Sequence, residues 1–166
     1  MSSVLFVCTG NATRSVLAAS LLADLRPDLR PMSSGTLVIE GCPPSARTRA
    51  AFESIGLPVP PHRSAQARFA DLAAADAVVA LAPEHVGWVR REHPEVAGHT
   101  VTLKRLHRDL VPGREPLRRR IEALQPAAIE IEDWEEVVDP GGHEVDVYVA
   151  CALEIRDLMF DLADRW

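Results

Sequence analysis

Cysteine is scarce in this chain of 166 residues, which contains only Cys8, Cys42 and Cys151. Three widely spaced cysteines do not make a disulfide framework, and no Cys-x-x-Cys pair or Cys/His spacing indicates a zinc site. We therefore expect no metal and no cofactor. The scarcity is typical of a reducing compartment, in which a thiol near the N-terminus can stay reactive.

Long apolar runs and an excess of positive charge are also missing. No apolar stretch approaches the length of a membrane span, and the N-terminus lacks the basic region and apolar core of a signal peptide. The net charge of −6 argues against general nucleic-acid binding. These absences predict a cytoplasmic protein that binds neither membranes nor nucleic acids, and we expect a monomer or a weak dimer.

The residues that are present predict one α/β domain over residues 1–166. Hydrophobic residues make up 47% of the chain, which is ordinary for a globular protein, and the length suits one core. Short apolar segments alternate with helical patterns, which implies a parallel sheet with right-handed connections. Strands are expected at 4–7, 31–33, 76–82 and 101–103. Helices are expected at 15–26, 46–55, 83–91, 114–124 and 148–162, with a further short helix that ends at residue 74.

Residues 4–15, Val-Leu-Phe-Val-Cys-Thr-Gly-Asn-Ala-Thr-Arg-Ser, form the most informative segment. The apolar residues 4–7 predict a buried strand, Gly10 and Asn11 suit a loop with unusual backbone angles, and a helix begins at Ser15. In a strand–loop–helix unit, the loop amides and the positive end of the helix dipole converge on one point. The segment therefore predicts an anion-binding site.

Cys8 and Arg14 flank this loop. A thiol beside a helix N-terminus exists largely as thiolate near neutrality, and an arginine fork matches two oxygens of a tetrahedral anion. An isolated cysteine is more often a small buried side chain, and the arginine alone would be read as a surface residue. Their spacing, with Gly10-Asn11 between them and Ser15 after, instead indicates a nucleophile that attacks phosphorus.

The pattern Cys8-(five residues)-Arg14-Ser15, preceded by Val-Leu-Phe-Val at the N-terminus, resembles the phosphate loop of the low-molecular-weight protein tyrosine phosphatases. The resemblance implies a three-layer, flavodoxin-like sandwich in which a four-stranded parallel sheet, order 2-1-3-4, has helices on both faces. It also implies a metal-independent hydrolase that acts on phosphotyrosine-type protein substrates or aryl phosphates through a phosphocysteine. The implied phosphate-binding residues are Thr9, Gly10, Asn11, Ala12, Thr13, Arg14 and Ser15.

A second segment of interest is Asp139-Pro140-Gly141-Gly142, which by composition alone is a turn. The resembled family carries its general acid on an Asp-Pro loop just before the last helix, so the resemblance implies that role for Asp139. Cys8 would attack the phosphorus while Arg14 holds the phosphoryl oxygens. Asp139 would protonate the leaving oxygen and then activate the water that cleaves the phosphocysteine.

The resemblance also implies supporting residues around the loop. Ser33 lies in a Ser-Ser-Gly-Thr segment that would otherwise be a plain turn, and His62 precedes Arg63-Ser64. Together with Asn11 and Ser15, they are expected to fix the loop by side-chain hydrogen bonds.

Several residues depart from the family pattern. Thr13 replaces a frequent second cysteine, so no disulfide protection of Cys8 is expected, and Val16 replaces a proline. Gly141-Gly142 stand where phosphotyrosine phosphatases usually have aromatic residues, and Ala12 gives no support to phosphoarginine specificity. The basic run 118–120 is expected to be a solvated face, and the role of 104–138 stays unassigned.

Two other functions remain open at this point. The first is arsenate reduction with an external small thiol, because Cys42 and Cys151 lack the spacing of an internal relay. The second is a phosphate-binding relative that is non-catalytic or only weakly active.

Overall fold

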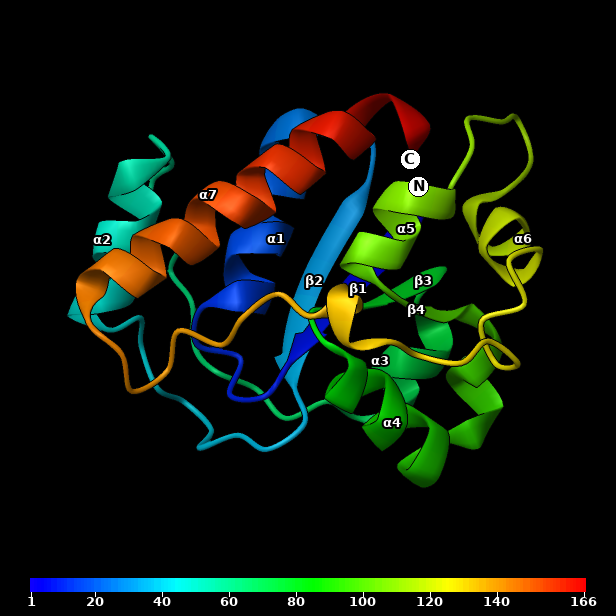
Figure 1. Cartoon of the computed structure of the whole chain (residues 1–166), viewed down its shortest axis with the longest axis horizontal. Coiled ribbons are helices and arrows are strands. Elements are labelled where there is room, and N and C mark those ends of the chain that lie inside the picture. Colours follow the sequence, from blue (N-terminus) through cyan, green and yellow to red (C-terminus); the bar gives the residue numbers. More distant parts are fainter.

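The computed structural model describes residues 1–166 and contains a four-stranded parallel sheet in the order β2-β1-β3-β4 (Figure 1). The predicted order 2-1-3-4 is therefore confirmed. In the register of the two neighbouring strands, Cys8 lies opposite Gly35. The strands are β1 (Ser3–Cys8), β2 (Arg30–Gly35), β3 (Ala77–Ala80) and β4 (Thr100–Thr102).

Helices cover both faces of the sheet. Because side chains alternate along each strand, neighbouring residues of a strand pack against different helices. Val4 and Phe6 of β1 point into a large cluster with α1, α5 and α7, whereas Leu5 and Val7 pack with α3 and α4. None of the helices is both long and apolar enough to cross a membrane. The α-helices are α1 (Arg14–Leu25), α2 (Ala46–Ser54), α3 (Phe69–Ala74), α4 (Pro83–Glu92), α5 (Leu103–Asp109), α6 (Leu117–Glu122) and α7 (Val145–Leu162); the short 3-10 helices are η1 (Pro94–His99), η2 (Asp133–Glu135) and η3 (Ala163–Arg165).

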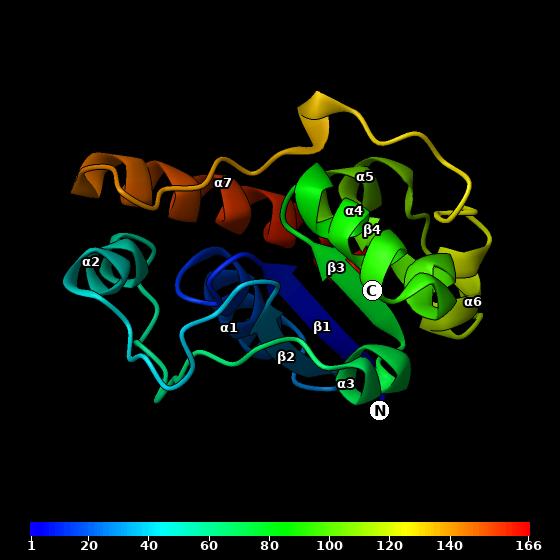
Figure 2. The same cartoon turned by 90° about the horizontal axis from the view of Figure 1, so that it is seen from below.

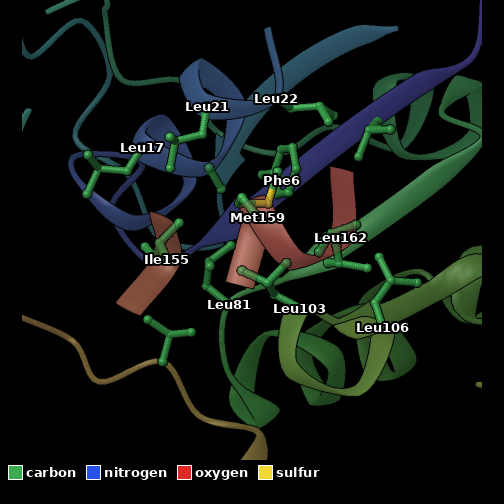
Figure 3. Packing of buried hydrophobic residues seen from close by; sticks show 14 of the residues in the cluster. Phe6, Leu17, Leu21, Leu22, Leu81, Leu103, Leu106, Ile155, Met159 and Leu162 are labelled. Carbon is green, nitrogen blue, oxygen red and sulfur yellow. The ribbon is translucent and has the colours of Figure 1, made fainter. Parts of the chain in front are cut away.

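The long helix α7 closes the larger cluster of 27 buried residues. Figure 1 shows α7 running beside α1 and α2, and Figure 2 shows it from the side, above β1. In the close view of Figure 3, Phe6 lies next to Met159, between the leucines of α1 and those of α5. This packing holds the C-terminal helix α7 and Trp166 against β1 at the start of the chain.

The segment after β4 differs from the prediction. The expected strand 101–103 ends at Thr102, and the unpredicted helix α5 begins at Leu103. Thr102 caps this helix by accepting a hydrogen bond from the Arg105 backbone N–H, and Leu106 is fully buried. A helix of seven residues is too short to show a clear hydrophobic period, which explains why the sequence did not indicate it.

The basic run 118–120 is not the solvated face that its charge suggested. Arg118 donates to the backbone carbonyls of Ala73 and Ala75, at 2.9 and 2.7 Å. Arg120 donates to the carbonyl of Arg165 at 2.7 Å. Two of the three arginines therefore tie α6 to the ends of α3 and of the chain.

Candidate active site

The loop between β1 and α1 places Cys8 and Arg14 at its two ends. Cys8 is the last residue of β1 and Arg14 is the first residue of α1, and both are almost fully buried. Asn11 at the middle of the loop has a φ of 48°, in the left-handed region that asparagine tolerates. The hydroxyl of Ser15 lies 3.0 Å from Cys8 Sγ, where it can stabilise a thiolate.

The side chain of Asn11 holds the loop from inside. Its Nδ2 donates to the hydroxyls of Ser15 and Ser33, both at 3.0 Å, and its Oδ1 accepts from the Ala65 backbone N–H at 2.9 Å. Asn11 is completely buried, and its bond to Ser15 is buried as well, whereas the bonds to Ser33 and Ala65 are part-buried. The predicted group of Asn11, Ser15 and Ser33 is thus brought together around one amide.

Two side chains from the segment before α3 hold the backbone carbonyl of Asn11. It accepts hydrogen bonds from His62 Nε2 at 2.7 Å and from the Ser64 hydroxyl at 3.0 Å. His62 therefore reaches the loop as the resemblance implied. Ser64 was missed, although its place two residues after His62 in an extended segment puts both side chains on one side.

Thr13 and Thr48 form another contact that the sequence did not predict. The two hydroxyls lie 2.8 Å apart, and Thr48 also donates to the Ala12 carbonyl at 3.3 Å. Thr48 is in the first turn of α2, where Ser45 caps the helix by accepting from the Thr48 backbone N–H. Thr13, which stands where the resembled family often has a second cysteine, thus attaches α2 to the loop.

Arg14 connects the loop to a distant part of the chain. Its Nη1 donates to the Val137 carbonyl at 3.0 Å, and its Nη2 lies 3.3 Å from Asp139 Oδ2. Asp139 is half-exposed, and its Oδ1 accepts from the Gly141 backbone N–H at 2.9 Å. In Figure 1 the loop before α7, coloured yellow to orange, reaches the blue loop between β1 and α1.

A pocket of about 250 Å³ opens where these groups meet. Cys8 and Arg14 lie among its lining residues with Asp139 on one side, and Tyr148 of α7, which the sequence did not single out, also lines it. The loop residues Thr9, Gly10, Ala12 and Thr13 complete the wall. The pocket thus holds a thiol, a guanidinium and a carboxyl group within reach of one bound anion.

The buried His85 of α4 is a further neighbour that the sequence did not indicate. Its Nε2 lies 3.0 Å from the hydroxyl of Thr9. Burial, and next the positive charge of Arg14, lower the pKa of His85 to about 3, against a smaller opposing effect of Asp139. The ring is therefore neutral at physiological pH.

The other two cysteines differ from Cys8 in their surroundings. Burial raises the pKa of the Cys151 thiol to about 12, so it stays protonated near neutrality. Cys42 is exposed on the loop before α2, and all three cysteines are free. No group of three His, Cys, Asp or Glu side chains is arranged to hold a metal ion.

A thiol at the end of a parallel strand, in a pocket with an arginine from the start of the next helix, is the arrangement of a cysteine-based phosphatase. The family model described as low molecular weight phosphotyrosine protein phosphatase matches residues 3–140. The chain therefore belongs to this family.

Relatives cover nearly the whole chain. A protein-arginine-phosphatase from Geobacillus stearothermophilus is 28% identical over 98% of this chain and 94% of its own length. The low molecular weight protein-tyrosine-phosphatase PtpB from Staphylococcus epidermidis is 27% identical over 94% of this chain and 93% of its own. The crystal structure of a low molecular weight protein tyrosine phosphatase from T. tengcongensis has a TM-score of 0.78 at 27% identity and covers 100% of both chains.

Proposed function

We propose that this protein hydrolyses phosphate monoesters on protein substrates, of the phosphotyrosine type, through a phosphocysteine intermediate. The observation that carries this proposal is the meeting of Cys8, Arg14 and Asp139 in one pocket, with Asp139 Oδ2 only 3.3 Å from Arg14 Nη2. A nucleophile, a cation and a proton donor are the three groups that phosphoryl transfer to a thiol requires.

The first step forms a bond between Cys8 Sγ and phosphorus and breaks the bond from phosphorus to the substrate oxygen. The thiolate supplies the electron pair, and the Ser15 hydroxyl at 3.0 Å stabilises it beforehand. The loop N–H groups and Arg14 stabilise the charge on the equatorial oxygens. Asp139, in its protonated form, transfers its proton to the leaving oxygen.

The second step releases inorganic phosphate. Asp139, now a carboxylate, accepts a proton from water, and the water oxygen attacks the phosphorus of the phosphocysteine. The sulfur leaves as a thiolate, which restores the starting state. The backbone N–H of Gly141, which donates to Asp139 Oδ1 at 2.9 Å, orients the carboxylate for both steps.

Phosphoarginine is a second candidate substrate. The relative from Geobacillus stearothermophilus, which covers 98% of this chain, is named a protein-arginine-phosphatase. Tyr148 is the one aromatic residue that lines the pocket. The loop positions that could add further aromatic walls for a phenol ring lack them, because Gly141-Gly142 follow Pro140 and the exposed hydrophobic side chains before Gly41 are the aliphatic Leu37 and Ile39. Against this candidate, Ala12 supplies no hydroxyl to the substrate.

A peptide panel separates these possibilities. Phosphotyrosine, phosphoserine and phosphoarginine versions of one peptide are incubated with the wild-type protein and with Cys8→Ser, and released phosphate is measured. We expect turnover of the phosphotyrosine peptide by the wild type alone. Phosphate release by Cys8→Ser at the wild-type rate would overturn the mechanism. Release of phosphate from the phosphoarginine peptide alone would show that phosphoarginine, and not phosphotyrosine, is the substrate. Arsenate-dependent oxidation of a small thiol, without phosphate release, would indicate a reductase instead.

A further inference from the structure

The hydroxyl of Thr9 lies at a junction of three polar groups beside the pocket. Arg14 Nη2 donates to Thr9 Oγ1 at 3.4 Å. His85 Nε2 lies 3.0 Å from the same oxygen, and Glu84 Oε1 lies 3.3 Å from it. Thr9 therefore joins the guanidinium at the start of α1 to the first turn of α4.

The hydrogen-bonding capacity of these groups determines the direction of each bond. The His85 side chain is 1% exposed, and its Nδ1 is buried with no partner. The one proton of the neutral ring belongs on Nε2, because a buried N–H at Nδ1 would have no acceptor. The His85 Nε2–H then donates to Thr9 Oγ1, the nearer acceptor at 3.0 Å, with Glu84 Oε1 at 3.3 Å as a second acceptor. Thr9 Oγ1 also accepts from Arg14, and the Thr9 hydroxyl donates to Glu84.

The other two contacts of Arg14 cannot fix Nη2 throughout the reaction. Nη1 is held by the Val137 carbonyl, but Nη2 is shared between Thr9 and Asp139. Asp139 is half-exposed, and under the function proposed above its carboxyl serves first the leaving oxygen and then the attacking water, so it is not a constant partner of Nη2. Thr9 is then the side chain that still accepts from Nη2.

We propose that His85 is a positioning residue, whose Nε2–H holds the Thr9 hydroxyl and through it the guanidinium of Arg14 in the orientation that receives phosphoryl oxygens. This inference rests on the proposed phosphatase function and extends it to α4. The neutral ring supplies one directed N–H without adding a second cation beside Arg14. A phenyl ring at this position would fill the same space without the donor.

The test compares three variants that remove the hydrogen bond: His85→Phe, Thr9→Val and the double variant. Inorganic phosphate affinity is measured as competitive inhibition of p-nitrophenyl phosphate turnover and by direct titration calorimetry. We expect each single variant to weaken phosphate binding about tenfold, the usual range for one hydrogen bond to a charged group. The double variant should bind phosphate as tightly as the single variant that has the lower affinity, because both changes break the same chain of hydrogen bonds.

Three controls separate positioning from general damage. His85→Gln keeps a donor and should restore most of the phosphate affinity. His99→Phe changes another buried histidine, which bonds to the Leu72 carbonyl, and should alter stability without altering phosphate affinity. Alkylation of Cys8 by neutral iodoacetamide should proceed at the wild-type rate in His85→Phe, because the Cys8–Ser15 contact is unchanged.

The outcomes distinguish this inference from the function on which it rests. Wild-type phosphate affinity in a folded His85→Phe, or additive losses in the double variant, would overturn the positioning role while leaving turnover intact. If His85→Phe does not fold, wild-type affinity in Thr9→Val overturns it equally. A wild-type protein that binds phosphate with the expected pattern but hydrolyses no phosphoester would instead refute the proposed function alone.

Discussion

Asp139 and Arg14 come from opposite ends of the chain, and their side chains lie 3.3 Å apart. Removing the exposed carboxyl group of Asp139 tests directly whether it donates the proton to the leaving oxygen. We expect Asp139→Ala to lower kcat by about 10²- to 10⁴-fold for aryl phosphates with poor leaving groups, and less for p-nitrophenyl phosphate. The measurement is kcat across a series of phenols of increasing acidity. Asp146→Ala, an exposed change in the first turn of α7, is the matched control. An equal loss for every phenol would argue against proton donation.

A substitution at Ser15 tests whether its hydroxyl stabilises the thiolate of Cys8. Its hydroxyl lies 3.0 Å from Cys8 Sγ and is itself held by Asn11 Nδ2. Ser15→Ala removes a donor to the thiolate, and we expect alkylation of Cys8 by iodoacetamide at pH 7 to slow about tenfold. Ser20→Ala on the same helix should leave the rate unchanged. An unchanged rate in Ser15→Ala would mean that the loop amides alone stabilise the thiolate.

The close approach of β2 to the loop depends on a glycine. A Cβ built on Gly35 would lie 2.3 Å from the Thr9 carbonyl oxygen and 2.8 Å from the Asn11 backbone nitrogen. Because these neighbours are backbone atoms, Gly35→Ala must displace the loop, and we expect a loss of phosphate affinity of at least tenfold together with a lower melting temperature. Gly87→Ala in α4 meets nothing within 4 Å and should raise stability by up to about 1 kcal/mol. Unchanged phosphate binding in Gly35→Ala would show that the strand can move away.

A buried ion pair anchors the segment that leads to Asp139. Glu135 of η2 pairs with Arg105 of α5, and both are nearly fully buried. Glu135→Gln removes the one buried carboxylate beside Arg105 and leaves it the more exposed Glu132 and Asp109, at 3.3 and 3.8 Å, so we expect the free energy of unfolding to fall by about 1 to 3 kcal/mol. Because Val137, two residues on, accepts from Arg14, turnover should fall as well. Glu136→Gln, at an exposed neighbour, should have neither effect in urea denaturation or kinetics.

For the molecule as a whole, buried histidines make stability depend on pH. Burial, with Arg14 as the second cause, lowers the pKa of His85 to about 3, and burial also lowers the pKa of His99. The unfolded chain takes up protons below about pH 6.5 whereas the folded protein does not, so the free energy of unfolding falls as the pH falls. The contribution of His85 to the slope should approach about 1.4 kcal/mol per pH unit, and His99 should add to it in the same direction.

Urea denaturation between pH 7 and pH 5 measures this slope in the range where an ordinary histidine takes up its proton. His85→Gln should remove part of the slope, and the exposed His143→Gln should remove none. A wild-type stability that does not change over this range would show that His85 is protonated or exposed in solution.

The N-terminal segment and the order of the elements could be predicted from the sequence, because the information is local. Apolar residues 4–7, the glycine and asparagine of the loop and the helical period after Arg14 specify a strand, a loop and a helix within one short stretch. The same local pattern identified Cys8 and Arg14, and the family resemblance then supplied the sheet order and the site residues Asp139, Ser33 and His62. The helix α5 and the roles of Arg118 and Arg120 were missed, because a short helix has no clear period and an arginine's partner carbonyls lie far away in sequence.

What the sequence by itself determined is the loop between β1 and α1, since its backbone angles, its amides and the placing of Cys8 and Arg14 at its ends all follow from neighbouring residues. Only the tertiary structure decided which other side chains reach that loop. Asp139, Thr48, Ser64 and His85 arrive there because the parallel strands end at one edge and α7 packs across α1. Burial of the apolar faces fixes these distances, and no local pattern records which polar side chains the packing brings together.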